Sequence, residues 1–188
     1  MTKEQDAKLF ELNTFAKRIN PKVEILVKEE SALMRFLNIF ARIFNKDFLS
    51  NTIVAFATRI YVPRASLDCD LRNKIVHEVK GHVPQYRKCG LGSIWLGFLV
   101  FVFLYGLAFF PIFLAYFRYR FELGAHTEEW RWDLENGRSP SEVRKSAALS
   151  AQSVASNVYF WTLPGAWVFY GYEKRLNKVV AEWSSKDG

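Results

Sequence analysis

Two of the chain's three histidines, His77 and His82, lie five residues apart, and Glu78 directly follows the first. Neutral imidazoles are good ligands for Zn²⁺, and a carboxylate beside such a ligand can accept a proton from a water that the metal activates. These residue types therefore indicate a metal site able to hydrolyse a substrate.

The spacing of the two histidines constrains the helix that carries them. The common helical zinc motif places its histidines four residues apart, which leaves about 40° between them around the helix, whereas five residues leave about 140°. One ion cannot join both imidazoles on a regular helix, so we expect a single-turn π-bulge, a feature that tends to mark functional sites. Gly81 gives the backbone the freedom to form it.

The segment His77-Glu78-Val79-Lys80-Gly81-His82 resembles the HExxGH motif of the dipeptidyl-peptidase III family, whose zinc peptidases carry this one-residue insertion. That family takes its third zinc ligand from a glutamate on a later helix. The segment Phe121-Glu122-Leu123-Gly124-Ala125 matches the E-x-x-A part of that motif and lacks the preceding acid. The resemblance implies Glu122 as the third ligand, and it extends to the site rather than to the fold or the substrate.

A second, looser resemblance concerns the order of the elements. A strand, an HExxH-like helix with Gln85, and then a glutamate helix are similar to small gluzincin-type metallopeptidase domains, some of them encoded by phages. In zinc peptidases of this layout, the strand before the metal helix can bind substrate along its edge.

The expected site has Zn²⁺ held by His77, His82 and Glu122, with Glu78 as the general base for cleaving a peptide or protein substrate. His126 lies at i+4 from Glu122, so it shares that helix face and could donate to the oxyanion, orient Glu122 or replace it. An exposed histidine with no role is the alternative.

Further residues could support the site. Two tyrosines, Tyr159 and Tyr170, are further candidates for the oxyanion donor. Glu128 and Glu129 are expected in solvent, although one of them could orient a histidine.

The apolar patterns predict an α+β protein that is mainly helical, and the resemblance implies a small zincin-like core. The region 52–62 is rich in β-branched and aromatic residues, which predicts a strand or a tight hairpin. Asp68 or Asp70 should cap the metal helix, and Ser139 and Glu142 should form a capping box. The predicted helices cover 3–19, 31–44, 71–87, 117–135, 140–159 and 167–183, and a further strand covers 23–27. Ser31 should cap the second of these helices, and its aromatic and apolar stripe should lie in the core: Leu33, Met34, Phe36, Leu37, Phe40, Ala41 and Phe44.

The region 91–117 is expected to form an apolar hairpin. Residues 94–117 are uncharged and long enough to span a bilayer. A single straight span would place Glu122 across the membrane from both histidines, so the zinc hypothesis requires a turn near 105–106 or 110–111. Basic residues on both sides favour two cytoplasmic ends. The hairpin would dip into a membrane or pack in a hydrophobic groove, and a soluble buried hairpin is the alternative.

The length of 188 residues suits one domain, 1–188, with the hairpin as an insert. The net charge of +7 suits an anionic partner such as a lipid surface, and no motif specifies nucleic acid. Cys69 and Cys89 give no disulfide framework, and the polar N-terminus lacks the apolar core of a signal peptide.

Two functions follow from these features, and the oligomeric state stays open. The first is a zinc metallopeptidase associated with a membrane or a hydrophobic protein partner, on the cytoplasmic face of a membrane or within a larger assembly. The alternative is a non-catalytic protein, membrane-associated or part of particle assembly, whose histidines are incidental.

Overall fold

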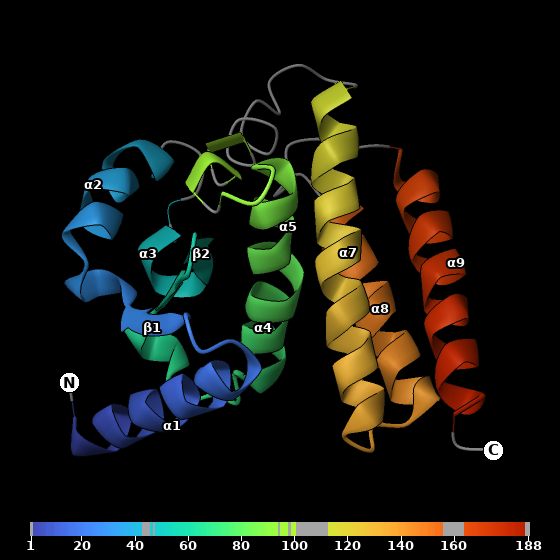
Figure 1. The fold of residues 1–188 in the computed structure, drawn as a ribbon, viewed down its shortest axis with the longest axis horizontal. Helices are drawn as coiled ribbons and strands as arrows, with labels where there is room; N and C mark the ends of the chain where they lie inside the picture. The colour runs from blue at the N-terminus through green and yellow to red at the C-terminus, as the bar shows by residue number, and fades with distance from the viewer. Residues whose placement is uncertain are drawn as a thin grey trace. The chain divides into compact units, whose positions relative to one another are not determined.

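The computed structural model describes residues 2–42, 46, 48–93, 95–97, 99–100, 113–155 and 164–186 (Figure 1). These residues form a mainly helical α+β structure with one small sheet, which confirms the predicted fold class. The chain groups into two compact units, Met1–Val79 and Lys80–Gly188. The single domain expected over residues 1–188 stays a prediction.

The first unit contains a three-stranded sheet in the order β1-β3-β2. Strand β1 pairs with β3 in parallel, and β2 and β3 form a tight antiparallel hairpin, one of the two forms expected for residues 52–62. Ala57 in its turn has a φ of 57°, in the left-handed region. The elements of this unit are α1 (Lys3–Ile19), β1 (Glu24–Val27), η1 (Lys28–Glu30), α2 (Ala32–Ala41), α3 (Phe48–Asn51), β2 (Val54–Phe56), β3 (Arg59–Val62), η2 (Arg64–Ser66) and α4 (Arg72–Val76).

The position of each strand decides which edges of the sheet a peptide could reach. Strand β3 is central and has a partner on both sides, so β2 is the outer strand of the predicted hairpin. At the other edge, the Asn13 amide pairs with the backbone of Ile25: its Oδ1 accepts from the Ile25 N–H at 2.8 Å, and its Nδ2 donates to the Ile25 carbonyl at 2.9 Å. This side chain occupies the backbone groups that a further strand would use at Ile25.

The core of the first unit includes the charged side chain of Lys28. The Lys28 ammonium donates to the carbonyl of Phe48 and, at 2.8 and 2.9 Å, to the carbonyl and hydroxyl oxygens of Thr52, and it lies 3.6 Å from the centre of the Phe48 ring. Burial lowers the pKa of Lys28 to about 8. The lysine therefore satisfies carbonyls around the single turn of α3.

The prediction that the apolar stripe of α2 belongs to the core is wrong at Leu33 and Phe36, and the side chain of Phe40 and the whole of Phe44 lie outside the described residues. Met34 is buried, but the Phe36 side chain is 57% exposed and Leu33 is 38% exposed. The start of this helix is as predicted, since the Met34 N–H donates to the Ser31 hydroxyl at 3.3 Å.

In the second unit, three long helices, α7 (Phe113–Glu135), α8 (Pro140–Ala155) and α9 (Gly165–Ser184), pack together (Figure 1). Small residues of α8 such as Ala147 and Ala151 lie in the core between larger side chains of its neighbours. The capping box at the start of α8 is confirmed: the Ser139 N–H donates to the Glu142 carboxylate at 3.0 Å, and the Glu142 N–H donates to the Ser139 hydroxyl at 3.3 Å. The core comprises Tyr119, Trp130, Leu134, Val143, Ala147, Ala151, Val154, Val168, Tyr172, Leu176 and Val179.

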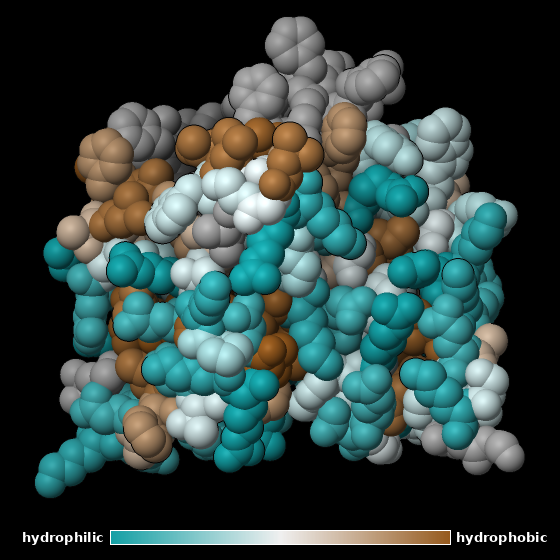
Figure 2. Space-filling model, in the orientation of Figure 1, coloured by the Kyte–Doolittle hydropathy of each residue, from teal (hydrophilic) through white to brown (hydrophobic). Residues whose placement is uncertain are grey.

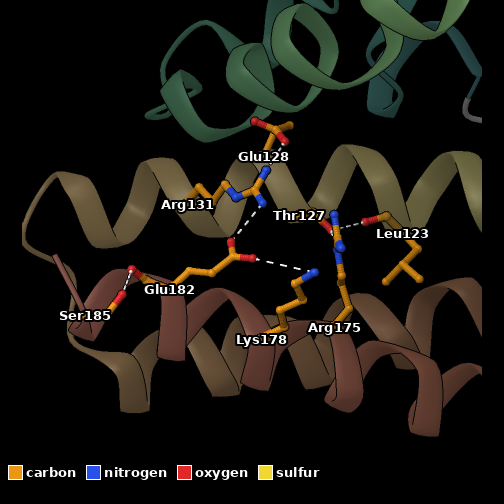
Figure 3. A network of polar contacts seen from close by, with 8 residues as sticks. All are labelled: Leu123, Thr127, Glu128, Arg131, Arg175, Lys178, Glu182 and Ser185. Atoms are coloured by element: carbon orange, nitrogen blue, oxygen red, sulfur yellow. Dashed lines mark hydrogen bonds and ion pairs between the residues drawn. The ribbon is translucent and has the colours of Figure 1, made fainter.

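Polar contacts on the surface join α7 to α9 (Figure 3). The Arg131 guanidinium donates to Glu128 on its own helix at 2.7 Å and to Glu182 on α9 at 3.1 Å. One helical turn away, Arg175 donates to the Thr127 hydroxyl at 3.2 Å. These contacts align the two helices along their length, with Thr127 directly after His126.

The start of the expected apolar hairpin is described only in part. After α5 (Val83–Cys89), the chain turns at Leu91 and Gly92, both of which have positive φ, and residues 95–97 are helical again. The turn expected near 105–106 or 110–111 lies outside the described residues. Within the described part of the chain, no helix has both the length and the apolarity needed to cross a bilayer.

Candidate metal centre

The helix that carries the histidines contains the π-turn that their spacing predicts. Helix α4 runs into a π-helical segment, η3 (His77–His82), which continues as α5. Bonding from i to i+5 widens this turn, so that residues five apart come to one face. His77, Glu78 and His82 are all buried, and their ligand atoms lie within 4.8 Å of one another.

Pro84 neither ends nor interrupts this helix, which continues to Cys89. The proline stands in the first turn of α5, directly after the π-helical segment. A proline is tolerated there because its missing N–H would have no partner in a new turn. The expected cap of the metal helix is wrong in position: Leu71 is the N-cap of α4 and makes no side-chain capping bond, while the Asp70 carboxylate accepts from the Arg72 N–H at 3.1 Å.

The segment after Lys80 packs closely against α7. A Cβ at Gly81 would lie 2.5 Å from the Cα and Cβ of Ala125, so only glycine fits at this contact. One turn further, the Gln85 Nε2 donates to the Phe121 carbonyl at 2.9 Å. The close approach of Gly81 explains why a small residue is needed at 125. The contacts at Phe121 and Ala125 lie on either side of Glu122 along α7.

Glu122 and His126 belong to a second group with His77. The ligand atoms of these three buried residues also lie within 4.8 Å of one another. Among the described residues, these are the two groups of His, Cys, Asp or Glu whose ligand atoms lie close enough together to hold a metal ion. His77 belongs to both groups. Neither group joins His82 to Glu122, so the predicted set of His77, His82 and Glu122 stays a prediction.

His126 is buried and oriented by its neighbours rather than exposed. Its Nδ1 lies 2.9 Å from the Glu129 carboxylate, three residues later on the same helix. The imidazole stacks on the Trp130 ring at 6.3 Å between centroids and lies 5.7 Å from the ring of Tyr172. Glu129 is only 4% exposed, so the expectation that it is solvated is wrong, and the expectation that a glutamate orients a histidine is confirmed.

Tyr170 is the one of the two tyrosines proposed as oxyanion donors that the structure describes. Tyr159 lies outside the described residues. Tyr170 is 66% exposed on α9, whereas Tyr172, two residues later and on the opposite side of the helix, is buried beside His126. The sequence carried a signal for Tyr172, because the apolar face of α9 includes Val168, Leu176 and Val179 at helical spacing from it.

The donor chemistry of the two groups fits a metal ion. Imidazole nitrogens and carboxylate oxygens are the ligands of catalytic zinc, and such sites use three protein ligands and leave a fourth position open. Buried His and Glu groups of this chain could therefore hold a metal ion.

No protein-family model, curated protein or solved structure matches this chain. The features that bear on its function are therefore its own: a π-helical segment, and two buried groups of His and Glu side chains in a mainly helical α+β protein.

Proposed function

We propose that this protein is a zinc-dependent metallopeptidase associated with a membrane or a hydrophobic protein partner. The observation that carries the proposal is the π-helical segment His77–His82, which gathers two histidines and a glutamate whose spacing would separate them on a regular helix. A π-turn costs regular helical hydrogen bonding and occurs mostly at functional sites.

The ligands in this proposal are His77, His82 and Glu122, as the motif implies. His77 is central because it belongs to both buried groups, and His126 stands beside Glu122 as a further ligand or as a donor to the oxyanion. Bound zinc would lower the pKa of a water to about 7 and polarise the scissile carbonyl.

Glu78 is the general base in this scheme. Its carboxylate is buried, with an oxygen within 4.8 Å of the ligand atoms of both motif histidines, so it would stand beside a water bound to an ion that these histidines held. It accepts the proton of the attacking water and passes that proton to the amine nitrogen that leaves. The burial of these side chains limits competing access by bulk water.

Hydrolysis by a Glu78→Gln variant tests the proposal. Protein purified without metal and reconstituted with zinc is offered a fluorescence-quenched peptide library of random sequence. The variant should keep its zinc and lose about 10²- to 10⁴-fold in rate, since the amide cannot accept the proton. Glu135→Gln, at an exposed position at the end of α7, is the control that should keep full activity. Equal rates in wild type and Glu78→Gln would contradict the proposal.

The membrane part of the proposal is supported by the segment after α5. Residues 83–121 contain no acidic residue, and their four basic residues all flank the apolar stretch. The apolar stretch suits the interior of a bilayer, and the basic residues at its two ends suit the anionic headgroups. Figure 2 shows apolar side chains gathered in one part of the view. In the described part of residues 83–121, the exposed large apolar side chains are Leu91, Trp95, Leu96, Leu99 and Tyr116.

The same exposed side chains favour the alternative function, a non-catalytic membrane-associated or particle-assembly protein. The two proposals differ in their response to substitutions. In the alternative, His77→Ala leaves function intact, and Leu99→Asp abolishes binding to the membrane or partner. In the peptidase, His77→Ala removes hydrolysis. Both proposals place the protein on the cytoplasmic face of a membrane or within a larger assembly.

A further inference from the structure

Gln85 makes two hydrogen bonds at the candidate metal centre with the two ends of one amide group. Its Oε1 lies 3.0 Å from the Nδ1 of His82, one turn earlier on the helix. Its Nε2 donates to the backbone carbonyl of Phe121 on α7 at 2.9 Å. The side chain therefore joins a motif histidine to the residue that precedes Glu122.

These two contacts fix the direction of every hydrogen bond involved. The Phe121 carbonyl can only accept, so the amide NH₂ must face it and the amide oxygen must face His82. An amide oxygen also can only accept, so the His82 Nδ1 carries the hydrogen. In a neutral imidazole the other nitrogen, Nε2, then holds the lone pair that a metal ion needs.

The surroundings of Gln85 leave little freedom for another arrangement. A Cβ at Gly124 would lie 2.9 Å from the Gln85 Nε2, so the glycine on α7 makes room for this amide. The flipped amide would place its oxygen against the Phe121 carbonyl oxygen, an arrangement with no hydrogen bond and with electrostatic repulsion.

The same pattern recurs at the third histidine. Glu129 stands three residues after His126 on one helix, as Gln85 stands three residues after His82, and its carboxylate accepts from Nδ1 at 2.9 Å. Histidine ligands of metals commonly donate their second N–H to such a partner, which sets the tautomer and the orientation of the ring. The recurrence indicates that both imidazoles carry their hydrogen on Nδ1 and leave the lone pair on Nε2.

We infer that Gln85 is a positioning residue of the metal centre: it holds His82 in the tautomer whose Nε2 bears the lone pair, and it ties this ring to α7 beside Glu122. The metal-binding consequence rests on the proposed function, whereas the tautomer of His82 is a property of the metal-free protein. Gln85 itself contacts neither substrate nor metal in this scheme.

The test combines imidazole NMR with zinc affinity. Long-range ¹H–¹⁵N spectra of metal-free protein at about pH 8, above the ordinary histidine pKa of about 6.5, report which nitrogen of each ring bears the hydrogen. The chain has only three histidines, so the signals can be assigned with single His→Gln variants. Zinc affinity is measured by competition with a chelator for wild type, Gln85→Met, Gln85→Glu and the control Gln152→Met, which is exposed on α8.

His82 of the wild type should carry its hydrogen on Nδ1. Gln85→Met should lose this preference and bind zinc about 10- to 100-fold more weakly. Gln85→Glu keeps an acceptor for Nδ1 but loses the donor to the Phe121 carbonyl, so it should restore the tautomer and recover only part of the zinc affinity. Gln152→Met should match the wild type. Because Gln85→Glu and the wild-type spectrum are sufficient, the test remains decisive if Gln85→Met does not fold.

Two results would overturn the inference: a wild-type His82 with its hydrogen on Nε2, or a Gln85→Met protein with unchanged tautomer and zinc affinity. Failure of the wild type to bind zinc is a different result. It would overturn the proposed function, and the NMR spectrum would still decide whether Gln85 sets the tautomer of His82.

Discussion

Gly81→Ala is the substitution whose effect follows most directly from the geometry. The new Cβ would lie 2.5 Å from both the Cα and the Cβ of Ala125. Carbon atoms in protein interiors pack at about 3.5 to 4.0 Å, so the overlap is about 1 to 1.5 Å. Neither contacted atom can rotate away, because one belongs to the backbone and the other is fixed to it. The segment around His82 must therefore move away from α7 by about 1 Å.

The expected cost of this movement comes from two opposing terms. Overpacking of an interior contact destabilises by about 1 to 3 kcal/mol, and a clash with backbone belongs at the upper end. Alanine has the higher helix propensity, which offsets about 1 kcal/mol of this destabilisation. We therefore expect Gly81→Ala to lower the free energy of unfolding by about 2 kcal/mol. The displaced His82 and Glu122 should also bind zinc about 10- to 100-fold more weakly, as when ligand support is lost.

Urea denaturation of the metal-free protein and chelator competition for zinc measure the two effects separately. The matched control is Gly165→Ala at the start of α9, where a Cβ would lie 3.9 Å from the Ala155 side chain, an ordinary contact. This control should be as stable as the wild type or slightly more so. A Gly81→Ala protein with wild-type stability and zinc affinity would refute the close contact with Ala125.

Three further predictions concern stability. Because burial lowers the pKa of Lys28 to about 8 from 10.5, the folded protein binds fewer protons than the unfolded chain between these pH values. The stability of wild type relative to Lys28→Met should rise across that window by about 1 to 3 kcal/mol in urea denaturation at each pH, and a constant difference would contradict this. Ser139→Ala should cost about 1 kcal/mol in the same assay, through loss of the α8 cap. Arg138→Met should cost about 1 to 3 kcal/mol, because it removes a 2.8 Å ion pair to the buried carboxylate of Asp133; no change in the unfolding midpoint would refute that role.

The parts of the fold that the sequence predicted depend on local chemistry. The π-turn could be predicted because two histidines five residues apart can face one ion in few other ways on a helix. The capping box at Ser139 and the hairpin over 52–62 likewise depend on residues within a few positions of one another. Such interactions need no knowledge of the rest of the chain.

The features that the sequence did not predict depend on distant partners. The pairing of Asn13 with Ile25 and the hydrogen bonds of the Lys28 ammonium to Phe48 and Thr52 join residues 12 to 24 positions apart. The periodicity of α2 predicts an apolar face but does not show what covers it, so the exposure of Phe36 could not be predicted. The partners of His82 and His126 could have been predicted from the sequence. An acceptor stands three residues after each histidine, and residues three apart meet on a helix.

Zinc content tests the central claim most directly. Metal-free protein is incubated with excess zinc, passed through a desalting column and analysed by inductively coupled plasma mass spectrometry. The proposed centre predicts about one zinc ion per wild-type chain and a large loss in His77→Ala, because His77 belongs to both buried groups. A wild-type chain that retains no zinc, or a His77→Ala chain that retains as much as wild type, would contradict the metal centre.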